Sequence, residues 1–284
     1  MAQFTNQAQL SYNNATINSN VAVGEVLEVL SAAKTAVTET YTQGDTVTYV
    51  ISAVNSGAIP LGGITVSDNL GAYQFGETTL YPLSYVDGSV RLYINGVLQA
   101  APAVTAGPPL VFSGITIPAG GDMVLVYETE VNGFAPLGEG DSIVNTATVS
   151  GGGISTPLVV SEAVIPVAEP VLDITKSISP VPVAENGVVT YTFVIRNSGN
   201  APADAAANVT LTDTFLPVLS DLTVLLDGVA LAPGSGYTYA VTEGDFATVP
   251  GVITVPAATY VQDPVTGVWS VTPGVTILTV SGTI

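Results

Sequence analysis

The chain has 284 residues, 47% of them hydrophobic, which is enough for two domains with apolar cores. Its formal charge of −19 repels nucleic acid and anionic membrane surfaces, so we expect neither nucleic-acid binding nor membrane insertion. Cys and His are absent, which excludes disulfides, thiolate metal sites and a histidine base, and we expect no cofactor and no metal.

The first 26 residues resemble a stretch that lies far along the chain. "FTNQAQLS" at 4–11 nearly repeats "IVNTATVS" at 143–150. Segments 2–26 and 141–165 align without a gap, which places Asn6 on Asn145, Ala8 on Ala147, Leu10 on Val149, Ser11 on Ser150 and Val21 on Val160. In a strand, one face would carry Phe4, Asn6, Ala8 and Leu10.

Short apolar runs with a period of two follow this segment, separated by Gly, Pro, Asn and Asp. Examples are "TVTYVISAVNSG" at 46–57 and "VVTYTFVIRNSG" at 188–199. No amphipathic helix is apparent. The pattern predicts an all-β protein with two tandem immunoglobulin-like β-sandwiches, one over residues 27–168 and a second, incomplete one over 169–284.

The two predicted sandwiches are copies of one repeat. Four stretches of the first recur in the second: 44–57 at 187–199, 64–70 at 209–215, 92–97 at 224–229, and 122–131 at 275–284. The second copy stops there, whereas the first continues through 141–165. The missing piece resembles the N-terminal segment.

A sandwich without its last strands leaves an apolar groove and unpaired backbone groups, and it can recruit a strand by β-augmentation. We predict that residues 1–26 are a donor strand segment. A donor from another subunit would propagate a filament, because the contact is head-to-tail and need not close. A donor from the same chain would give a closed monomer, for which domain one would have to double back. The remaining alternative is an N-terminal strand of domain one that resembles 143–150 by chance.

The only two lysines, Lys34 and Lys176, fall at the same place in the two repeats. Strand alternation puts Lys176 on the face of Leu172, Ile174 and Ile178, and Lys34 on that of Leu30, Ala32 and Ala36. The same reasoning turns Asp68, Asp213 and Asn145 toward apolar neighbours. Buried polar groups of this kind are costly unless they satisfy one another.

These residues allow two interpretations. The first is a buried Lys–Asp ion pair with a hydrogen-bonded Asn. The second is chemistry, because burial disfavours both charges and lets a neutral amine sit beside a protonated carboxyl. The amine could attack the Asn side-chain carbonyl while the Asp polarises it and moves protons, releasing ammonia and leaving an isopeptide bond. We favour the second.

The ordered set of Lys, "GDTVTY…NSG", "TVSDNL" or "TLTDTF", and "NTATVS" resembles the bacterial surface repeat called the conserved repeat domain, or domain of unknown function eleven. The Lys, Asp and Asn pattern is similar to that of isopeptide-forming Gram-positive pilin and adhesin domains. The resemblance implies a Lys34–Asn145 crosslink promoted by Asp68. In domain two Lys176 and Asp213 match, and the only matching Asn is Asn6 of another subunit.

This resemblance implies an extracellular structural protein on a cell or spore surface of a Gram-positive-like bacterium. The chain departs from sortase-built pilins, since it shows no sorting motif and no hydrophobic anchor. We therefore expect a self-assembling, pilus-like filament or spore appendage whose partners are other copies of the chain. No signal peptide is visible, so we expect either a trimmed leader or release by cell lysis.

Other classes are less well supported. Enzymatic turnover lacks a marked acidic pair, so we expect no enzyme beyond single-turnover isopeptide formation. An adhesin or stalk module could present aromatic residues to a protein or carbohydrate ligand, the candidates being Tyr85, Tyr93, Tyr237, Tyr239, Tyr260 and Trp269. Calcium could bind loop carboxylates, but the spacing of Asp87, Asp141, Asp221 and Asp263 matches no dedicated loop.

Overall fold

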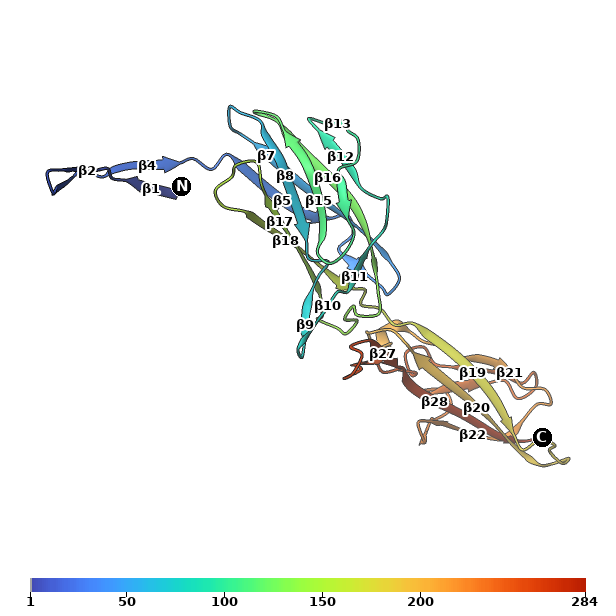
Figure 1. The fold of residues 1–284 in the computed structure, drawn as a ribbon. Helices are drawn as coiled ribbons and strands as arrows, with labels where there is room; N and C mark the ends of the chain where they lie inside the picture. The colour runs from blue at the N-terminus through green and yellow to red at the C-terminus, as the bar shows by residue number, and fades with distance from the viewer. Residues whose placement is uncertain (1) are drawn as a thin grey trace. The chain divides into compact units, whose positions relative to one another are not determined.

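A computed structural model describes residues 2–284 (Figure 1). The protein is all-β, as the sequence predicts, and the only helix in the described residues is the single-turn 3-10 helix η1 (Ala205–Ala207). The chain divides into two compact units. Unit one holds the residues up to 135 together with 142–165, and unit two holds 136–141 and 166–284.

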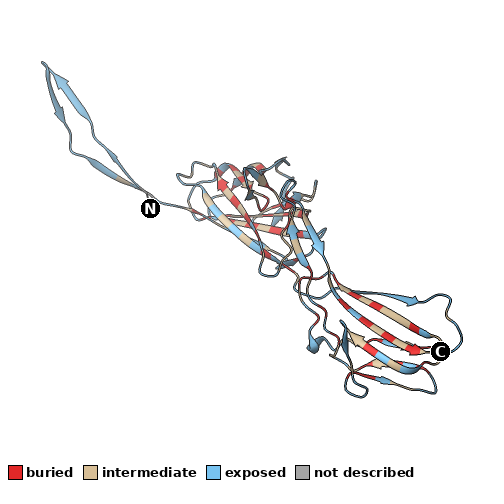
Figure 2. Ribbon diagram, turned by 90° about the horizontal axis from the view of Figure 1, so that it is seen from below, coloured by how far each residue is buried: buried red, intermediate tan, exposed pale blue. Residues whose placement is uncertain are grey.

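The N-terminal residues form a hairpin that we call the arm, residues 2–26. Its strands are β1 (Ala2–Asn6), β2 (Gln9–Tyr12), β3 (Ala15–Asn18) and β4 (Ala22–Val26). β1 pairs with β4 and β2 with β3, all antiparallel, and among the described strands none outside the arm pairs with these four. Asn13 and Asn14 form the tip with φ values of 45° and 61°, as a two-residue hairpin turn requires. The arm is exposed almost throughout (Figure 2).

Unit one contains two six-stranded sheets. The first has the order β13-β12-β16-β7-β5, with β11 also paired to β16. Its strands are β5 (Leu30–Ala36), β7 (Thr46–Asn55), β11 (Leu83–Tyr85), β12 (Arg91–Ile94), β13 (Val97–Leu98) and β16 (Asp122–Val131). The second has the order β14-β15-β8-β17-β18-β6. Its strands are β6 (Thr40–Tyr41), β8 (Leu61–Asp68), β14 (Ala103–Thr105), β15 (Leu110–Ile117), β17 (Ile143–Ser150) and β18 (Leu158–Pro166).

The core of unit one consists of alternate residues from the facing strands. β7, β16 and β17 each bury every second side chain, as half-buried antiparallel strands do. The largest side chains with almost no exposure include Tyr49, Tyr127, Phe112, Ile51 and Leu110. A short separate hairpin, β9 (Tyr73–Phe75) with β10 (Thr78–Leu80), completes this unit.

Unit two repeats five of the six strands of the first sheet, all except β11. Its order β19-β20-β28-β22-β23 matches β5-β7-β16-β12-β13 strand for strand (Figure 1). These strands are β19 (Leu172–Ser179), β20 (Val188–Asn197), β22 (Ser220–Leu226), β23 (Val229–Ala230) and β28 (Gly274–Thr283). A hairpin of β26 (Thr259–Gln262) and β27 (Trp269–Thr272) is an addition that unit one lacks.

The second sheet of unit two is cut short. It contains β24 (Tyr237–Tyr239), β25 (Asp245–Thr248) and β21 (Thr212–Thr214), in the order β21-β25-β24. β21 corresponds to β8, β25 to β15 and β24 to β14. β8 pairs with both β15 and β17, whereas β21 pairs with β25 alone among the described strands. The places of β17, β18 and β6 are empty in the described part of unit two.

The absence of these strands changes the burial of β19. The equivalent β5 buries Leu30 and Lys34, but all eight residues of β19 are exposed. Leu172, Ile174 and Ile178 are 39%, 55% and 43% exposed. Alternation correctly places them on one face, yet the expected burial does not occur, because no strand in unit two takes the place of β17 and β18. The remaining core gathers around Phe193, Phe215, Phe246, Leu278 and Val280.

Candidate functional site

A buried ion pair joins the two sheets of unit one. Lys34 on β5 donates from its Nζ to Oδ2 of Asp68 on β8, and both side chains are fully buried. Tyr127 on β16 donates its hydroxyl to the same Asp68 oxygen. The other oxygen, Oδ1, accepts from the backbone N–H of Leu70 at 2.8 Å. The carboxyl group is thus held from three directions in an apolar interior.

Aromatic rings surround the amine. The Nζ of Lys34 lies 4.6 Å from the ring centre of Tyr49 and 5.8 Å from that of Tyr127. Burial lowers the pKa of Lys34 to about 8, although the Asp68 carboxyl opposes the change. Burial also raises the pKa values of both tyrosines, so their hydroxyls stay protonated. A larger fraction of Lys34 is therefore in the neutral amine form at neutral pH than is the case for an exposed lysine.

Asn145 brings an amide to the same cluster. It lies on β17, fully buried, and its Oδ1 accepts from the backbone N–H of Gly71 at 3.2 Å. The Asn145 side chain interacts with the hydroxyl groups of Tyr49 and Tyr127, and this interaction opposes the rise of their pKa values. The Asn145 Nδ2 and the Tyr49 hydroxyl are nevertheless buried without a hydrogen bond of normal geometry in the described structure. Such an unsatisfied amide calls for an explanation.

Unit one therefore brings together the three residues that the sequence predicts, Lys34, Asp68 and Asn145. Sequence reasoning missed three neighbours: Tyr49, Tyr127 and Glu162. Glu162 on β18 lies opposite Asn145 in the strand pair, and its charge raises the pKa of Lys34. The tyrosines carry a signal that could have identified them, since both alternate with core residues, and Tyr49 recurs as Tyr191 in the second repeat.

Unit two holds half of this cluster in a more open setting. Lys176 on β19 donates to Oδ2 of Asp213 on β21, and their side chains are 42% and 18% exposed. The Nζ lies 4.8 Å from the ring centre of Tyr191 and 5.5 Å from that of Phe215. Val280 takes the place of Tyr127. No asparagine of unit two matches Asn145, because the strand that would carry it is missing.

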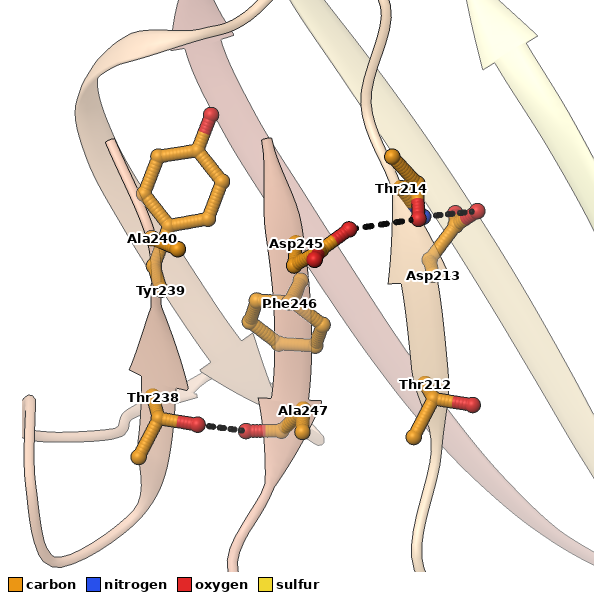
Figure 3. Close-up of a pocket in the computed structure, with 9 residues that line it drawn as sticks. All are labelled: Thr212, Asp213, Thr214, Thr238, Tyr239, Ala240, Asp245, Phe246 and Ala247. Atoms are coloured by element: carbon orange, nitrogen blue, oxygen red, sulfur yellow. Dashed lines mark hydrogen bonds between the residues drawn. The ribbon is translucent and has the colours of Figure 1, made fainter. Parts of the chain in front are cut away.

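The edge next to this ion pair is open. Thr212, Asp213 and Thr214 form β21 at the end of the sheet, beside β25, which has β24 on its other side (Figure 3). A hollow of about 690 Å³ is lined by all three strands. Oγ1 of Thr214 donates to Oδ1 of Asp245 at 2.8 Å across the strand pair. The free side of β21 is the place that β17 fills in unit one.

The predicted donor residues lie on the exposed arm. Asn6 pairs with Ala22 in the β1–β4 hairpin, and Phe4 and Leu10 are 57% and 65% exposed. The described arm has no core in which these apolar side chains could be buried, so it leaves an unusual amount of apolar surface in contact with solvent.

Metal and membrane sites are not apparent in the described chain. Between residues 2 and 284, no three acidic side chains gather as ligands for an ion. In the same range, no helix is long and apolar enough to span a bilayer.

No protein-family model and no curated protein matches this chain. Among solved structures it is similar to the D312A variant of BcpA, the major pilin subunit of Bacillus cereus, with 12% identity and a TM-score of 0.38 over 87% of this chain and 64% of that one. It is also similar to RrgB, the pilus backbone from Streptococcus pneumoniae, with 12% identity and a TM-score of 0.34 over 86% and 55%.

The full-length major pilin SpaD from Corynebacterium diphtheriae gives 11% identity and a TM-score of 0.35 over 85% and 60% of the two chains. The chain thus spans roughly 55–64% of the length of these three proteins.

Proposed function

We propose that this protein is the structural subunit of a self-assembling extracellular filament on a cell or spore surface. Subunits join head to tail when the arm of one fills the open edge of unit two in the next. The observation that carries this proposal is a complementary pair: the described part of unit two lacks the strand that β17 supplies in unit one, and the arm has a sequence that resembles that strand.

The pairing of β17 with β8 in unit one is a template for the contact between the arm of one subunit and unit two of the next, which we call the joint. There, Ala147, Thr148 and Val149 lie opposite Asp68, Ser67 and Val66. The alignment of the arm with β17, and of β21 with β8, transfers this register to the joint. Ala8 would then lie opposite Asp213, Gln9 opposite Thr212 and Leu10 opposite Leu211. Main-chain hydrogen bonds supply affinity, and the exposed apolar side chains of arm and acceptor become buried.

In this register Asn6 reaches the place of Asn145, beside Lys176 and Asp213. We propose that an isopeptide bond then forms. The neutral Nζ of Lys176 attacks Cγ of Asn6 while the protonated carboxyl of Asp213 polarises the amide oxygen. The C–Nδ2 bond breaks, and the nitrogen leaves as ammonia after taking up the one proton that the lysine amine loses. An amine and a primary amide become one secondary amide and ammonia.

The same reaction inside unit one would join Lys34 to Asn145. The buried amide with an unpaired Nδ2 and a lysine pKa near 8 support it. Forming the bond removes the lysine charge, and with it the desolvation penalty of burying that charge. This bond would link β5 covalently to β17 within unit one.

Purified protein, boiled in SDS and separated by electrophoresis, tests the joint. We expect a ladder of multimers that disappears in Asn6→Ala and in Lys176→Ala. Lys34→Ala should still form the ladder, because it removes only the bond within unit one. Asn18→Ala is a matched control, since it changes an exposed Asn of the same arm that lies outside the aligned donor strand. Intact mass should fall by one ammonia per bond.

Three outcomes separate the parts of the proposal. Fibres in electron micrographs that dissolve in boiling SDS would keep the donated strand and reject the covalent bond. A ladder that persists in Asn6→Ala would place the crosslink elsewhere. A single band of unshifted mass with no fibres would reject both the bond and the filament.

A further inference from the structure

The arm as it stands is paired in a register that does not match its template. In β17 and β18, Asn145 lies opposite Glu162 and Ala147 opposite Val160. In the arm, Asn6 lies opposite Ala22 and Phe4 opposite Gly24. Directly opposed residues in an antiparallel pair share a face. Val23, which lies opposite Thr5, is therefore on the face away from Phe4 and Asn6.

This arrangement splits the apolar residues of the arm between its two faces. Val23 is 62% exposed and lies opposite Thr5, while Phe4 is 57% exposed on the other side. A shift of β4 against β1 by an odd number of residues moves every β4 side chain to the opposite face. Val21 and Val23 would then join Phe4, Ala8 and Leu10, leaving Thr5, Gln7 and Gln9 outside.

Two odd shifts agree with the template. A shift of one residue follows from the gapless alignment and sets Val23 opposite Asn6, but it brings Glu25 to the place of Val164, which is fully buried. A shift of three residues sets Glu25 opposite Asn6, as Glu162 lies opposite Asn145. Residues 21–27, "VAVGEVL", then fall on 158–164, "LVVSEAV".

Unit two also has a vacant place for the second strand of the arm. In unit one, β18 is followed in the sheet by β6, and the N–H of Ile165 donates to the carbonyl of Glu39 at 3.0 Å. The repeat places residues 181–183 where 39–41 lie. They form no strand in the described structure, and Val181 is 74% exposed. The acceptor edge is therefore open for two strands.

We infer that the arm docks on a second copy of this chain as a two-stranded unit, after β4 has shifted by an odd number of residues against β1. This inference rests on the proposed function. The free arm is a stored form whose register prevents it from filling a groove, its own or a neighbour's. The rate of assembly then depends on the shift of β4 against β1, and β4 makes the second contact with residues 181–183 of the acceptor.

Engineered disulfides test the shift, because the chain has no cysteine of its own. Thr5→Cys with Val23→Cys joins residues that are opposite in the free arm. Thr5→Cys with Gly24→Cys fixes the one-residue shift, and Thr5→Cys with Val26→Cys fixes the three-residue shift. Oxidised Thr5→Cys/Val23→Cys should not assemble, and dithiothreitol should restore assembly. At least one of the other two pairs should assemble when oxidised, which also identifies the shift.

Assembly of the oxidised Thr5→Cys/Val23→Cys protein at the rate of its reduced form would overturn the inference. So would failure of both other oxidised pairs while their reduced forms assemble, because the arm would then have to open completely. Thr5→Cys alone controls for disulfides between subunits. If no reduced variant and no parent protein assembles, the proposed function itself fails, which is a different result.

Gly24 gives a test without cysteines. In the free arm the ring of Phe4 covers Gly24, and a Cβ at this position would lie 2.3 Å from the ring. After an odd shift, residue 24 faces outward, away from Phe4, so a methyl group there is harmless. The Phe4 ring is the end of an exposed side chain and can turn aside at small cost, so Gly24→Ala should destabilise only the stored form and speed assembly by about twofold. Slower assembly would contradict the shift.

Discussion

Asp68 lies directly opposite Ala147 across the pair of β8 and β17, so Asn145 lies two residues further along on the same face. This relationship sets the register for any strand that occupies the same place in unit two. It predicts that Gln9 of one subunit lies opposite Thr212 of the next, both facing outward.

A protein carrying Gln9→Cys, Thr212→Cys and Lys176→Ala should therefore form disulfide-linked multimers on oxidation, because the isopeptide bond is removed and only the cysteines can join subunits. Non-reducing electrophoresis measures the result. Thr214→Cys in place of Thr212→Cys is the matched control and should crosslink poorly. Equal crosslinking by both pairs would mean that the strand docks in another register.

The pH dependence of bond formation in unit one distinguishes two roles for Asp68. If the acid acts in its protonated form, the reacting state of the Lys34–Asp68 pair has the same net charge as the ion pair, since one proton has only moved between them. The rate should then be constant from about pH 6 to 7.5 and fall about tenfold per unit above pH 8, where the pair loses that proton.

Protein freshly refolded from denaturant, followed by intact mass, gives this rate in an Asn6→Ala background, which cannot form the bond between subunits. A rate that instead rises tenfold per unit up to pH 8 would show that only the amine must be neutral. Asp68 would then act as a carboxylate, and the acid role proposed for it would be wrong.

Tyr127 should stabilise the unreacted cluster through its hydrogen bond to Asp68. In an Asn145→Ala background, where no bond can form, Tyr127→Phe should lower the free energy of unfolding of unit one by about 1–3 kcal/mol, because a buried carboxyl group loses a donor. Urea unfolding followed by circular dichroism measures the change. Tyr49→Phe in the same background is the control, since the Tyr49 hydroxyl makes no hydrogen bond of normal geometry. Equal losses in both variants would assign the effect to packing.

Salt should speed assembly. Each subunit has a formal charge of −19, and screening shortens the range of their repulsion from roughly 30 Å at 0.01 M salt to about 8 Å at 0.15 M. Light scattering should therefore show faster growth at higher concentrations of either sodium or choline chloride. Acceleration by calcium alone, at an ionic strength too low to screen, would instead indicate a cation site at the joint.

Much of this architecture follows from the repeat and the period-two pattern. Val47, Tyr49 and Ile51 alternate with polar residues, so their strand and its inner face can be predicted without a structure. The positions of Lys34, Asp68 and Asn145 follow in the same way, because each sits on the inner face of its strand and is matched in, or missing from, the second repeat.

Other features depend on contacts that alternation does not describe. The exposure of Ile174 results from strands that are absent, and the register of β1 against β4 differs by one residue from that of β2 against β3 and places the ring of Phe4 over Gly24. The hydrogen bond from Tyr127 to Asp68 requires β16 and β8, which belong to different sheets, to bring these two side chains to the same level of the core. Sequence spacing gives the face of a residue but not its partner across the core.

The arm and the open edge belong to different units of one chain. In the proposed polymer, every string therefore has polarity: one end presents an unused arm and the other an unfilled edge. A chain trimmed to residues 27–284 could receive a neighbour but could not be inserted into one. Mixed with intact subunits, it would terminate filaments at one end only, so the concentration of trimmed chain would set their mean length.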